Sequence, residues 1–374
     1  MMLLTVNSGS TSVKLALYQA DGSAAPRRVS AEQQQGTSLD PTAVLRGFAS
    51  HLSEPPAAIA HRVVHGGTRF RKPTRIDDAV LSDIEELAPL APLHNPAALR
   101  WLRAAREIWS KTPQVAVFDT ALFAALPRLA CEYAIPPSLA AQHGVRRYGF
   151  HGLAHEAMWR AWCAQHPQLA EGGRLITLQL GGGCSITAFA HGHPLDTSMG
   201  FSPLEGLVMA TRCGDIDAAV VPYLQRQLQQ TGDAIVTLFN EQAGLKGLSG
   251  SDANPEQLLA SSDPQAQFAA ELYCYRIRKY LGSYLAVLGG CDGIVFGGGV
   301  GEHAPGVRAR AVTGLEWAGI ALDPAANSAA RGGDACISAA GSRVRVQIIA
   351  TDEESVLAAA AAAMLQGGEL AAPA

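Results

Sequence analysis

The sequence predicts an α/β protein made of two related domains that face a cleft. The chain has 374 residues, which is more than one hydrophobic core usually organises. Strand–turn–strand segments with small polar or glycine tips occur at 2–18 and at 175–189, so both halves of the chain begin alike. Apolar strands and helices are interspersed between and after these hairpins. The repeated beginning therefore favours two duplicated domains.

The composition narrows the classes of partner and the cellular compartment. A hydrophobic content of 48% and a formal net charge of −4 give no electrostatic reason to expect nucleic acid or an anionic membrane. The seven cysteines are an odd number without a CxxC pair, which indicates reduced thiols. There is no signal-peptide pattern and no apolar run long enough to span a bilayer. We therefore expect a cytoplasmic protein.

The first hairpin has turn chemistry at its tip, where residues 7–12 read NSGSTS. One interpretation is an ordinary hairpin with a polar tip. The other is a phosphate loop, in which hydroxyls and Gly9 donate to phosphate oxygens and Lys14 supplies charge. In that interpretation Asn7 contacts a metal ion or its waters.

Two charged residues stand at the ends of apolar strands. Arg62 lies in the buried strand 57–67, where an unpaired charge would be costly. In one interpretation its guanidinium reaches a carboxylate at the sheet edge. In the other it belongs to a functional site at the carboxyl end of the strand, which the neighbouring His61 and His65 favour. Asp119 follows the apolar run that begins at Val115, and it is a site residue or a helix cap.

Helical patterns occupy much of the remaining chain. We expect them at 41–52, 78–87, 97–109, 155–165, 218–230, 233–242, 255–259, 264–288 and 355–365. We expect an apolar strand, a glycine turn and a helix start within 293–305, and a late strand at 343–350. We expect a polar surface hairpin or loop at 24–42 and a turn-rich loop at 247–254. Glu353 and Glu354 precede the last helix and suit its dipole.

Two further segments carry an unusual density of special residues. Residues 146–155, RRYGFHGLAH, indicate a site loop that enters a helix, with His151 between glycines. Residues 178–217 contain a triple-glycine turn and Arg212. Glycines bring backbone N–H groups close to an anion, and an arginine binds phosphate or carboxylate with two donors. This stretch therefore predicts phosphate handling.

Together these motifs resemble the acetate and propionate kinase family of the actin–sugar kinase–Hsp70 superfamily. The resemblance covers nearly the whole chain and depends on segments that occur in the family's order: NSGSTSVK, HRVVHGG, APLHNP, FDTA, RRYGFHG, LGGG, DTSMGFSPLEGLVMATRCGDID, FGGGVGE and TDEE. It implies duplicated actin-like (ribonuclease H-like) domains. The first would comprise 1–122 plus the returning helix 354–374, and the second, 123–353, would hold the nucleotide.

The resemblance also implies an activity. It is the reversible, Mg²⁺-dependent transfer of the ATP γ-phosphate to acetate or another short carboxylate, giving acyl phosphate and ADP, with Mn²⁺ as a substitute ion and a homodimer as the assembly. A carboxylate with a pKa near ~4 is already ionised at neutral pH, so no general base is required. Asp119 is then an orienting group for a Mg²⁺-bound water or an arginine.

The family's residue roles carry over to matching positions. Asn7 and Glu353 would hold Mg²⁺ directly or through water; Ser10, Ser12 and Lys14 would form the phosphate loop; Arg62 would bind the acetate carboxylate; Val64, Leu93, Phe150 and Pro203 would surround its methyl group. Asp119, His151 and Arg212 would be catalytic. Gln179, Gly181, Gly182 and Gly183 would contact phosphates, and Gly297, Gly298, Gly299, Val300 and Gly301 would hold the adenosine with Asp252.

Departures from the family pattern cluster on the nucleotide side. Gln179-Leu-Gly-Gly-Gly replaces His-Leu-Gly-Asn-Gly, Phe123 and His303 replace a histidine and an asparagine, and the loop ending at Asn254 is shorter and lacks an arginine. Three alternatives therefore stay open. They are a propionate or butyrate kinase, an enzyme with GTP or pyrophosphate as donor, and a non-catalytic or filament-forming relative; the charged site residues disfavour the last.

Overall fold

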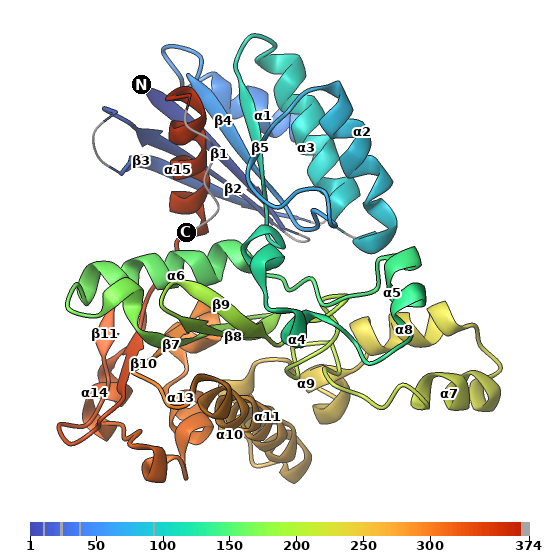
Figure 1. Cartoon of the computed structure of the whole chain (residues 1–374), viewed down its shortest axis with the longest axis vertical. Coiled ribbons are helices and arrows are strands. Elements are labelled where there is room, and N and C mark those ends of the chain that lie inside the picture. The colour runs from blue at the N-terminus through green and yellow to red at the C-terminus, as the bar shows by residue number, and fades with distance from the viewer. Residues whose placement is uncertain (10–11, 23–24, 37–38, 93, 368–374) are drawn as a thin grey trace. The chain divides into compact units, whose positions relative to one another are not determined.

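The computed structural model describes residues 1–9, 12–22, 25–36, 39–92 and 94–367, so Ser10 and Leu93 lie outside the described residues. The chain divides into two compact units (Figure 1). The first comprises Met1–Ala124, Phe150–Ala157 and the chain from Asp352. The second comprises Ala125–Gly149 and Met158–Thr351.

This division differs from the sequence-based boundaries mainly at 150–157, and by two residues at each of the other two boundaries. The sequence assigns 150–157 to the second domain, whereas the segment belongs to the first unit. The physical reason is its packing, because Leu153 and Ala157 join the buried core of that unit.

The first unit contains a six-stranded mixed sheet. Its strands are β1 Met2–Ser8, β2 Ser12–Gln19, β3 Arg27–Gln35, β4 Ala58–Val63, β5 Thr74–Arg75 and β6 Gln114–Phe118, in the order β3-β2-β1-β4-β6-β5. Strands β1, β4 and β6 are parallel to one another, while β2, β3 and β5 are antiparallel to their neighbours. The carboxyl ends of β1, β4 and β6 therefore share one edge.

The second unit repeats this sheet. Its strands are β7 Arg174–Leu180, β8 Cys184–Ala190, β9 His193–Thr197, β10 Gly293–Gly297, β11 Ala335–Cys336 and β12 Arg345–Ile348, in the order β11-β12-β10-β7-β8-β9. Here β7, β10 and β12 are parallel, and β8, β9 and β11 are antiparallel to their neighbours. When the second order is read from its other end, it corresponds to the first strand for strand, with β7 in the place of β1 and β10 in the place of β4. The predicted duplication is therefore confirmed.

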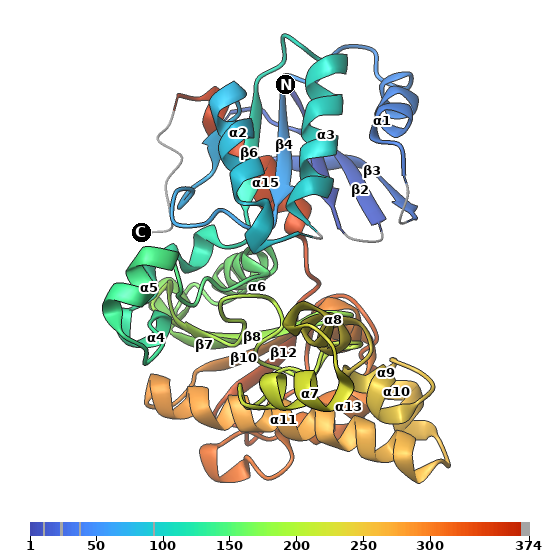
Figure 2. The same cartoon turned by 90° about the vertical axis from the view of Figure 1, so that its right-hand side faces the viewer.

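Helices cover both faces of the first sheet. They are α1 Pro41–Ala49, α2 Asp78–Glu86, α3 Asn95–Ile108 and α15 Glu353–Leu365. The alanine-rich α15 packs against β1, β4 and β6, whereas α1 and α3 bury Leu45 and Trp101 against the other face. Figure 2 shows α3 and α15 on opposite sides of the strands. The last helix thus returns to the sheet where the chain began.

The second unit carries the larger set of helices. They are α4 Arg128–Cys131, α5 Pro137–His143, α6 Gly152–Gln165, α7 Val220–Leu228, α8 Gly232–Glu241, α9 Gly244–Ser249, α10 Pro255–Ala260, α11 Pro264–Leu288, α12 Gly298–His303, α13 Pro305–Val312 and α14 Pro324–Ala329. Helix α6 begins in the first unit. In both views its later part and α11 lie on opposite faces of the second sheet.

Two sequence expectations need correction. The segment 24–42 contains β3, an exposed polar edge strand paired with β2; polar residues on both faces hide a strand pattern, and such residues protect an edge from pairing with other chains. The segment 247–254 is partly helical, since α9 extends to Ser249. Among the described residues, no helix combines the length and apolar character that a membrane crossing requires.

Candidate active site

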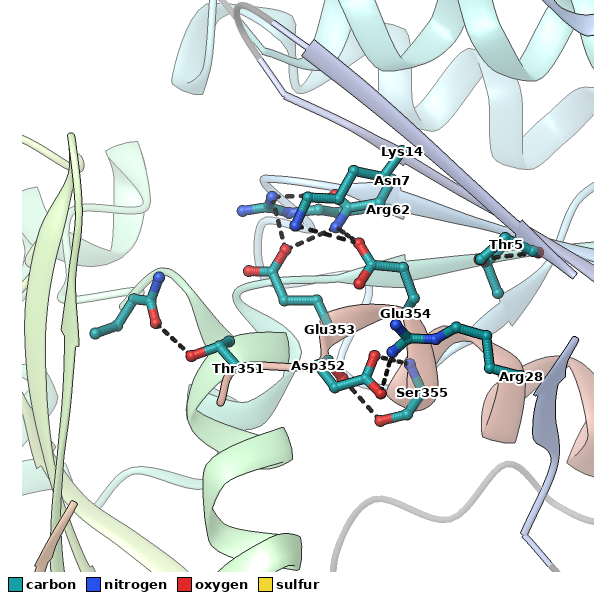
Figure 3. A network of polar contacts seen from close by, with 12 residues as sticks. Thr5, Asn7, Lys14, Arg28, Arg62, Thr351, Asp352, Glu353, Glu354 and Ser355 are labelled. Atoms are coloured by element: carbon teal, nitrogen blue, oxygen red, sulfur yellow. Dashed lines mark hydrogen bonds and ion pairs between the residues drawn. The ribbon is translucent and has the colours of Figure 1, made fainter. Parts of the chain in front are cut away.

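A polar cluster lies at the shared strand edge of the first unit. Asn7 is near the end of β1, Arg62 is near the end of β4, and Asp119 directly follows β6. Glu353 and Glu354 start α15 and point at the same place, as Figure 3 shows for the residues it labels. The parallel strands bring Asn7, Arg62 and Asp119 together, and α15 adds carboxylates that lie 346 and 347 positions from Asn7. The cluster is therefore a product of the fold.

Arg62 and Asp119 form its central ion pair. The Arg62 Nε lies 3.2 Å from both carboxylate oxygens, and Nη2 lies 2.7 Å from Oδ2. The Asp119 side chain is 1% exposed and that of Arg62 is 14% exposed. Burial by itself lowers the pKa of Arg62. Attraction to the carboxylates of Asp119 and Glu353 outweighs this effect and raises the pKa of Arg62 above its usual range. Burial raises the pKa of Asp119, and Arg62 opposes that rise.

Asn7 links this ion pair to α15. Its Nδ2 donates to Glu353 Oε2 and to Glu354 Oε1, each at 2.7 Å, while its Oδ1 accepts from Arg62 Nη1 at 3.2 Å. Arg62 Nη1 also lies 3.3 Å from Glu353 Oε2. Lys14 Nζ lies 3.7 Å from Glu354 Oε1. Every charge in the cluster therefore has an oppositely charged or amide partner.

The cluster offers oxygen ligands of the type that Mg²⁺ prefers. Glu353 supplies a carboxylate and Asn7 an amide oxygen, and Mg²⁺ in phosphoryl-transfer sites commonly takes one or two protein ligands and completes its shell with water and phosphate. Within the described ranges, no group of three or more His, Cys, Asp or Glu side chains is arranged to hold a metal by itself. The residues present thus fit an ion that is shared with a phosphate ligand.

The double-glycine turn after β4 is locked from two sides. Asn95 accepts from the His65 N–H at 3.1 Å and donates to the His65 carbonyl at 3.0 Å. Thr120 Oγ1 accepts from the Gly66 N–H at 2.9 Å. These contacts of Asn95 and Thr120 were not predicted from the sequence. Since the partners are 30 and 54 positions apart, the local sequence carries no signal for them.

Two of the residues expected around the acyl methyl group lie beside this turn. Val64 precedes His65 and is half-buried. Phe150 is buried, and its ring packs edge-on against the His65 imidazole with ring centroids 5.5 Å apart. The apolar side of the first-unit cluster is thus formed by the chain around β4 and the start of α6.

His151 occupies a special backbone conformation at the entry to α6. Its φ of 60° is uncommon for a residue with a side chain and costs on the order of 1–3 kcal/mol. The next residue, Gly152, has no room for a Cβ because the Asp119 carbonyl oxygen would overlap it. This close approach holds His151 beside Asp119, and the two glycines flanking Phe150-His151 were the sequence signal for it.

Behind His151 lies a second histidine that the sequence did not single out. His155 is fully buried and lies one helical turn further along α6. Burial, reinforced by the nearby His151, lowers its pKa well below the usual range. His155 is therefore neutral at physiological pH.

In the second unit, the glycine turn joins β7 to β8 as expected. The Gly181 N–H donates to the Gly183 carbonyl at 3.0 Å, and the Gly182 carbonyl accepts from the Ala210 N–H at 3.1 Å. A Cβ built on Gly182 would meet no atom within 4 Å. The turn is thus hydrogen-bonded to the segment before Arg212, and no other atom of the described residues crowds Gly182 at its tip.

Arg212 is half-buried and lacks charge compensation from its acceptors. Its Nη1 donates to the Pro203 carbonyl at 3.2 Å and lies 3.8 Å from the Met209 sulfur. Both acceptors are neutral, and burial lowers the pKa of Arg212. An incompletely hydrated guanidinium with neutral neighbours is a binding position for an anion.

A threonine joins the two glycine turns of the second unit. Thr351 Oγ1 donates to Gln179 Oε1 at 3.1 Å and accepts from the Gly298 N–H at 3.0 Å. Glu302 Oε1 accepts from the N–H groups of Gly298 and Thr351, each at 3.1 Å. Gln179 therefore keeps its NH₂ group as a donor. Sequence reasoning missed Thr351 and Glu302 as members of this network.

The remaining nucleotide-side residues have simpler surroundings. Gly299 and Val300 lie in the first turn of α12, between the buried Gly298 and Gly301. Asp252 is exposed, and its Oδ1 accepts from the Asn254 N–H at 2.9 Å. Asn254 in turn caps α10, so this departure from the family has a local structural role.

The sequence model of the Acetokinase family matches residues 31–359. The chain belongs to the acetokinase family. It is accordingly a phosphotransferase with a carboxyl group as acceptor, and the scaffold interpretation is set aside.

Individual members of the acetokinase family resemble the chain over most of its length. Acetate kinase from Streptomyces coelicolor is 44% identical over 336 residues, which cover 87% of this chain and 83% of the relative. The crystal structure of acetate kinase from Porphyromonas gingivalis matches with a TM-score of 0.85 at 34% identity, covering 97% and 99% of the two chains. A propionate kinase from Francisella tularensis matches with a TM-score of 0.84 at 34% identity, covering 96% and 98%. These structures confirm the predicted fold.

Proposed function

We propose that the enzyme transfers the γ-phosphoryl group of ATP reversibly to acetate, with Mg²⁺ or, in its place, Mn²⁺, giving acetyl phosphate and ADP. The observation that supports this most is the buried Arg62 held by Asp119 beside Asn7 and Glu353. The fixed cation can bind the carboxylate of the acceptor, and the neighbouring oxygen ligands can hold a metal ion that binds the phosphate.

Arg62 binds the carboxylate of the acceptor in this proposal. The ion pair with Asp119 fixes the plane of the guanidinium, so little side-chain entropy is lost when acetate arrives. Val64 and Phe150, with Leu93 and Pro203, surround the methyl group. Acetate needs no general base, and Asp119 therefore serves to orient Arg62.

Charge on the transferring phosphoryl group is stabilised by fixed donors. Arg212 supplies a cation whose acceptors are neutral, and His151 donates a hydrogen bond from its strained backbone position. Phosphoryl transfer depends mainly on positioning and electrostatic stabilisation.

The metal and nucleotide roles are assigned to the remaining predicted residues. Glu353 and the Asn7 amide oxygen hold Mg²⁺, directly or through water. When bound, the ion neutralises phosphate charge. The phosphates take donors from two sets, Ser10, Ser12 and Lys14 in the first unit and Gln179 with Gly181, Gly182 and Gly183 in the second. Adenosine is held by Gly297, Gly298, Gly299, Val300 and Gly301 with Asp252.

Acetate is the preferred acceptor in this proposal because the curated relatives bear the name acetate kinase. Propionate is the second candidate, since a propionate kinase matches equally well in structure. We also propose a cytoplasmic homodimer without nucleic-acid or membrane partners; size-exclusion chromatography with light scattering tests the dimer.

Trapping the acyl phosphate as a hydroxamate tests the proposed reaction. Acetate, propionate and butyrate are each assayed with ATP, GTP and pyrophosphate, with and without Mg²⁺. We expect acetate with ATP and Mg²⁺ to give the highest kcat/KM. Absence of product with every pair would contradict the proposal, while a higher value with another acceptor or donor would reassign the substrate.

A further inference from the structure

Three side chains of the second unit tie down the segment that leads to Arg212. Tyr133, Arg147 and Glu205 form a connected group, called here the 196–206 brace, around residues 196–206. Arg147 belongs to the segment 146–155, whose arginines have no role in the reaction described above. The brace lies within one unit, so its geometry is internal to that unit.

Arg147 is the centre of the brace. Its Nη2 lies 2.5 Å from Glu205 Oε1. Its Nη1 donates to the carbonyls of Thr197 and Ser198 at 3.2 Å and 3.1 Å, and its Nε donates to the Ala130 carbonyl at 3.2 Å. One buried guanidinium therefore connects the two ends of the segment.

Tyr133 secures the middle of the segment. Its hydroxyl donates to Glu205 Oε2 and accepts from the Phe201 N–H at 2.8 Å. A Cβ on Gly200 would overlap both the Glu205 carboxylate and the Tyr133 hydroxyl. A larger residue at position 200 would therefore displace the side chains of Tyr133 and Glu205.

The far end is fixed independently. Asp215 Oδ1 accepts from the Gly206 N–H at 2.9 Å, and Asp215 Oδ2 accepts from the Tyr280 hydroxyl at 2.8 Å. Between these anchors lies Pro203, whose carbonyl accepts from Arg212 Nη1 at 3.2 Å. A shift of the segment therefore moves an acceptor that aims the Arg212 guanidinium.

We propose that Tyr133, Arg147 and Glu205 are positioning residues for phosphoryl transfer, because they fix the Pro203 carbonyl that orients Arg212. The proposal rests on the proposed function, in which Arg212 stabilises the transferring phosphoryl group. It adds three residues that contact neither the phosphate nor the acceptor. These residues act on the transition state and not on substrate binding, so their substitution lowers kcat more than it changes KM.

Substitution at Glu205 tests the proposal against a matched control. We expect Glu205→Ala to lower kcat by about 10²-fold, as a misplacement near 1 Å can do, with the KM for ATP and acetate nearly unchanged. Glu205→Gln keeps an acceptor for Arg147 and recovers part of the loss. The control is Asp292→Ala, which removes the Arg174–Asp292 ion pair of the same unit and leaves kcat near that of the wild type. The Asp292 carboxylate is about as exposed as that of Glu205, at 32% against 30%.

A double-mutant cycle separates positioning from general destabilisation. If the brace acts through Arg212, Glu205→Ala adds less than about threefold to the kcat loss already caused by Arg212→Ala. Fully additive losses, or a kcat for Glu205→Ala equal to that of the control, would overturn the inference. Wild-type enzyme without phosphotransfer would instead refute the proposed function, so the two failures are distinguishable. Thermal unfolding of each variant identifies those that do not fold.

Discussion

At the scale of single residues, Arg62 combines the two interpretations that its sequence context allowed. Its head does reach a carboxylate at the sheet edge, and that carboxylate is Asp119, itself predicted as a site residue. Arg62 also bonds to Glu353 and Asn7, but a guanidinium has five N–H donors, so it remains able to donate to a further anion. The structural role and the proposed binding role are therefore compatible.

The substitution Asp119→Asn tests the orienting role. An amide still accepts a hydrogen bond but removes the charge that opposes Arg62, so we expect kcat/KM for acetate to fall by about 10²-fold. Removing one partner of a buried ion pair should also cost about 3–5 kcal/mol of stability. Initial rates at saturating ATP and Mg²⁺, with urea unfolding as the control, provide the measurement. A variant that keeps most of the wild-type rate would refute the role.

The substitution Arg212→Ala tests the stabilisation of the phosphoryl group. We expect kcat to fall by about 10³-fold, the size of effect found for arginine fingers, while the KM for acetate changes little. Steady-state kinetics with acetate and ATP provide the measurement. An unchanged kcat would remove Arg212 from the mechanism.

The buried His61 makes stability depend on pH. Its Nε2 lies 2.9 Å from Gln114 Oε1, and burial lowers its pKa to about 4. The unfolded chain has a pKa near ~6.5 and binds the proton first, so stability is complete above that pH and falls as the pH drops toward 4.

The substitution His61→Gln isolates this contribution. As the pH falls from 6.5 to 4, the free energy of unfolding decreases. We expect it to decrease by up to about 1.4 kcal/mol per pH unit more in the wild type than in the variant. Urea unfolding at several pH values compares the two slopes. Equal slopes would show that His61 is not the group responsible.

Residues at strand ends could be predicted from the sequence, whereas their partners could not. A polar residue that interrupts or ends an apolar run, such as Arg62 or Asp119, is visible in one dimension. The contacts of Asn95 with His65, and of Thr351 with Gln179, depend on register and crossover geometry. These contacts join residues that are 30 and 172 positions apart, so no local sequence pattern predicts them.

At the scale of elements, the start of α15 serves both local and long-range purposes. Asp352 caps the helix by accepting from the Ser355 N–H at 3.1 Å. Glu353 and Glu354 suit the helix dipole, as expected, and the same two carboxylates accept from Asn7. The start of α15 therefore combines a local cap with long-range hydrogen bonds to β1, and the metal role of Glu353 stays a prediction.

The turn network around Thr351 gives a prediction for nucleotide binding. Thr351→Val removes the hydroxyl between Gln179 and Gly298. Loss of one such hydrogen bond is worth about 1 kcal/mol, so we expect the KM for ATP to rise by roughly fivefold to tenfold while the KM for acetate stays unchanged.

Steady-state titration of ATP at saturating acetate measures this effect, and Thr351→Ser is the matched control because it restores the hydroxyl. Equal KM values for ATP in the valine and serine variants would contradict the assignment of this network to the nucleotide.

Elements with a clear period were predicted better than polar or short ones. The hairpin strands and the long helix at 264–288 have strong patterns, and they appear as β1, β2, β7, β8 and α11. Strand β3 was missed because it has polar residues on both faces. Helix α9 was missed because its six residues are rich in Gly and Ser.

At the scale of the whole molecule, the two sheets can be aligned residue by residue through their registers. In the first, Val6 pairs with His61 and His61 with Ala116. In the second, Leu178 pairs with Phe296 and Phe296 with Ile348. Counting from these pairs gives the equivalent positions at the strand ends.

The equivalent positions show how duplication produced two different clusters. The pairs are Asn7 with Gln179, Arg62 with Gly297, and Asp119 with Thr351. Where one unit has an ion pair, the other has a hydrogen-bonded threonine and a glycine turn. The same architecture therefore presents a charged cluster in one unit and a neutral glycine-rich one in the other.

In the proposed reaction, this enzyme moves a phosphoryl group from ATP to acetate with Arg62 and Arg212 as the two cations. Phosphorus NMR follows ATP, ADP and the acyl phosphate in one sample. The account predicts that wild-type enzyme with Mg²⁺ converts ATP and acetate to ADP and acetyl phosphate, and that Arg62→Ala and Arg212→Ala each nearly abolish the acetyl phosphate signal. Wild-type rates in both variants, or ADP without acetyl phosphate in the wild type, would contradict it.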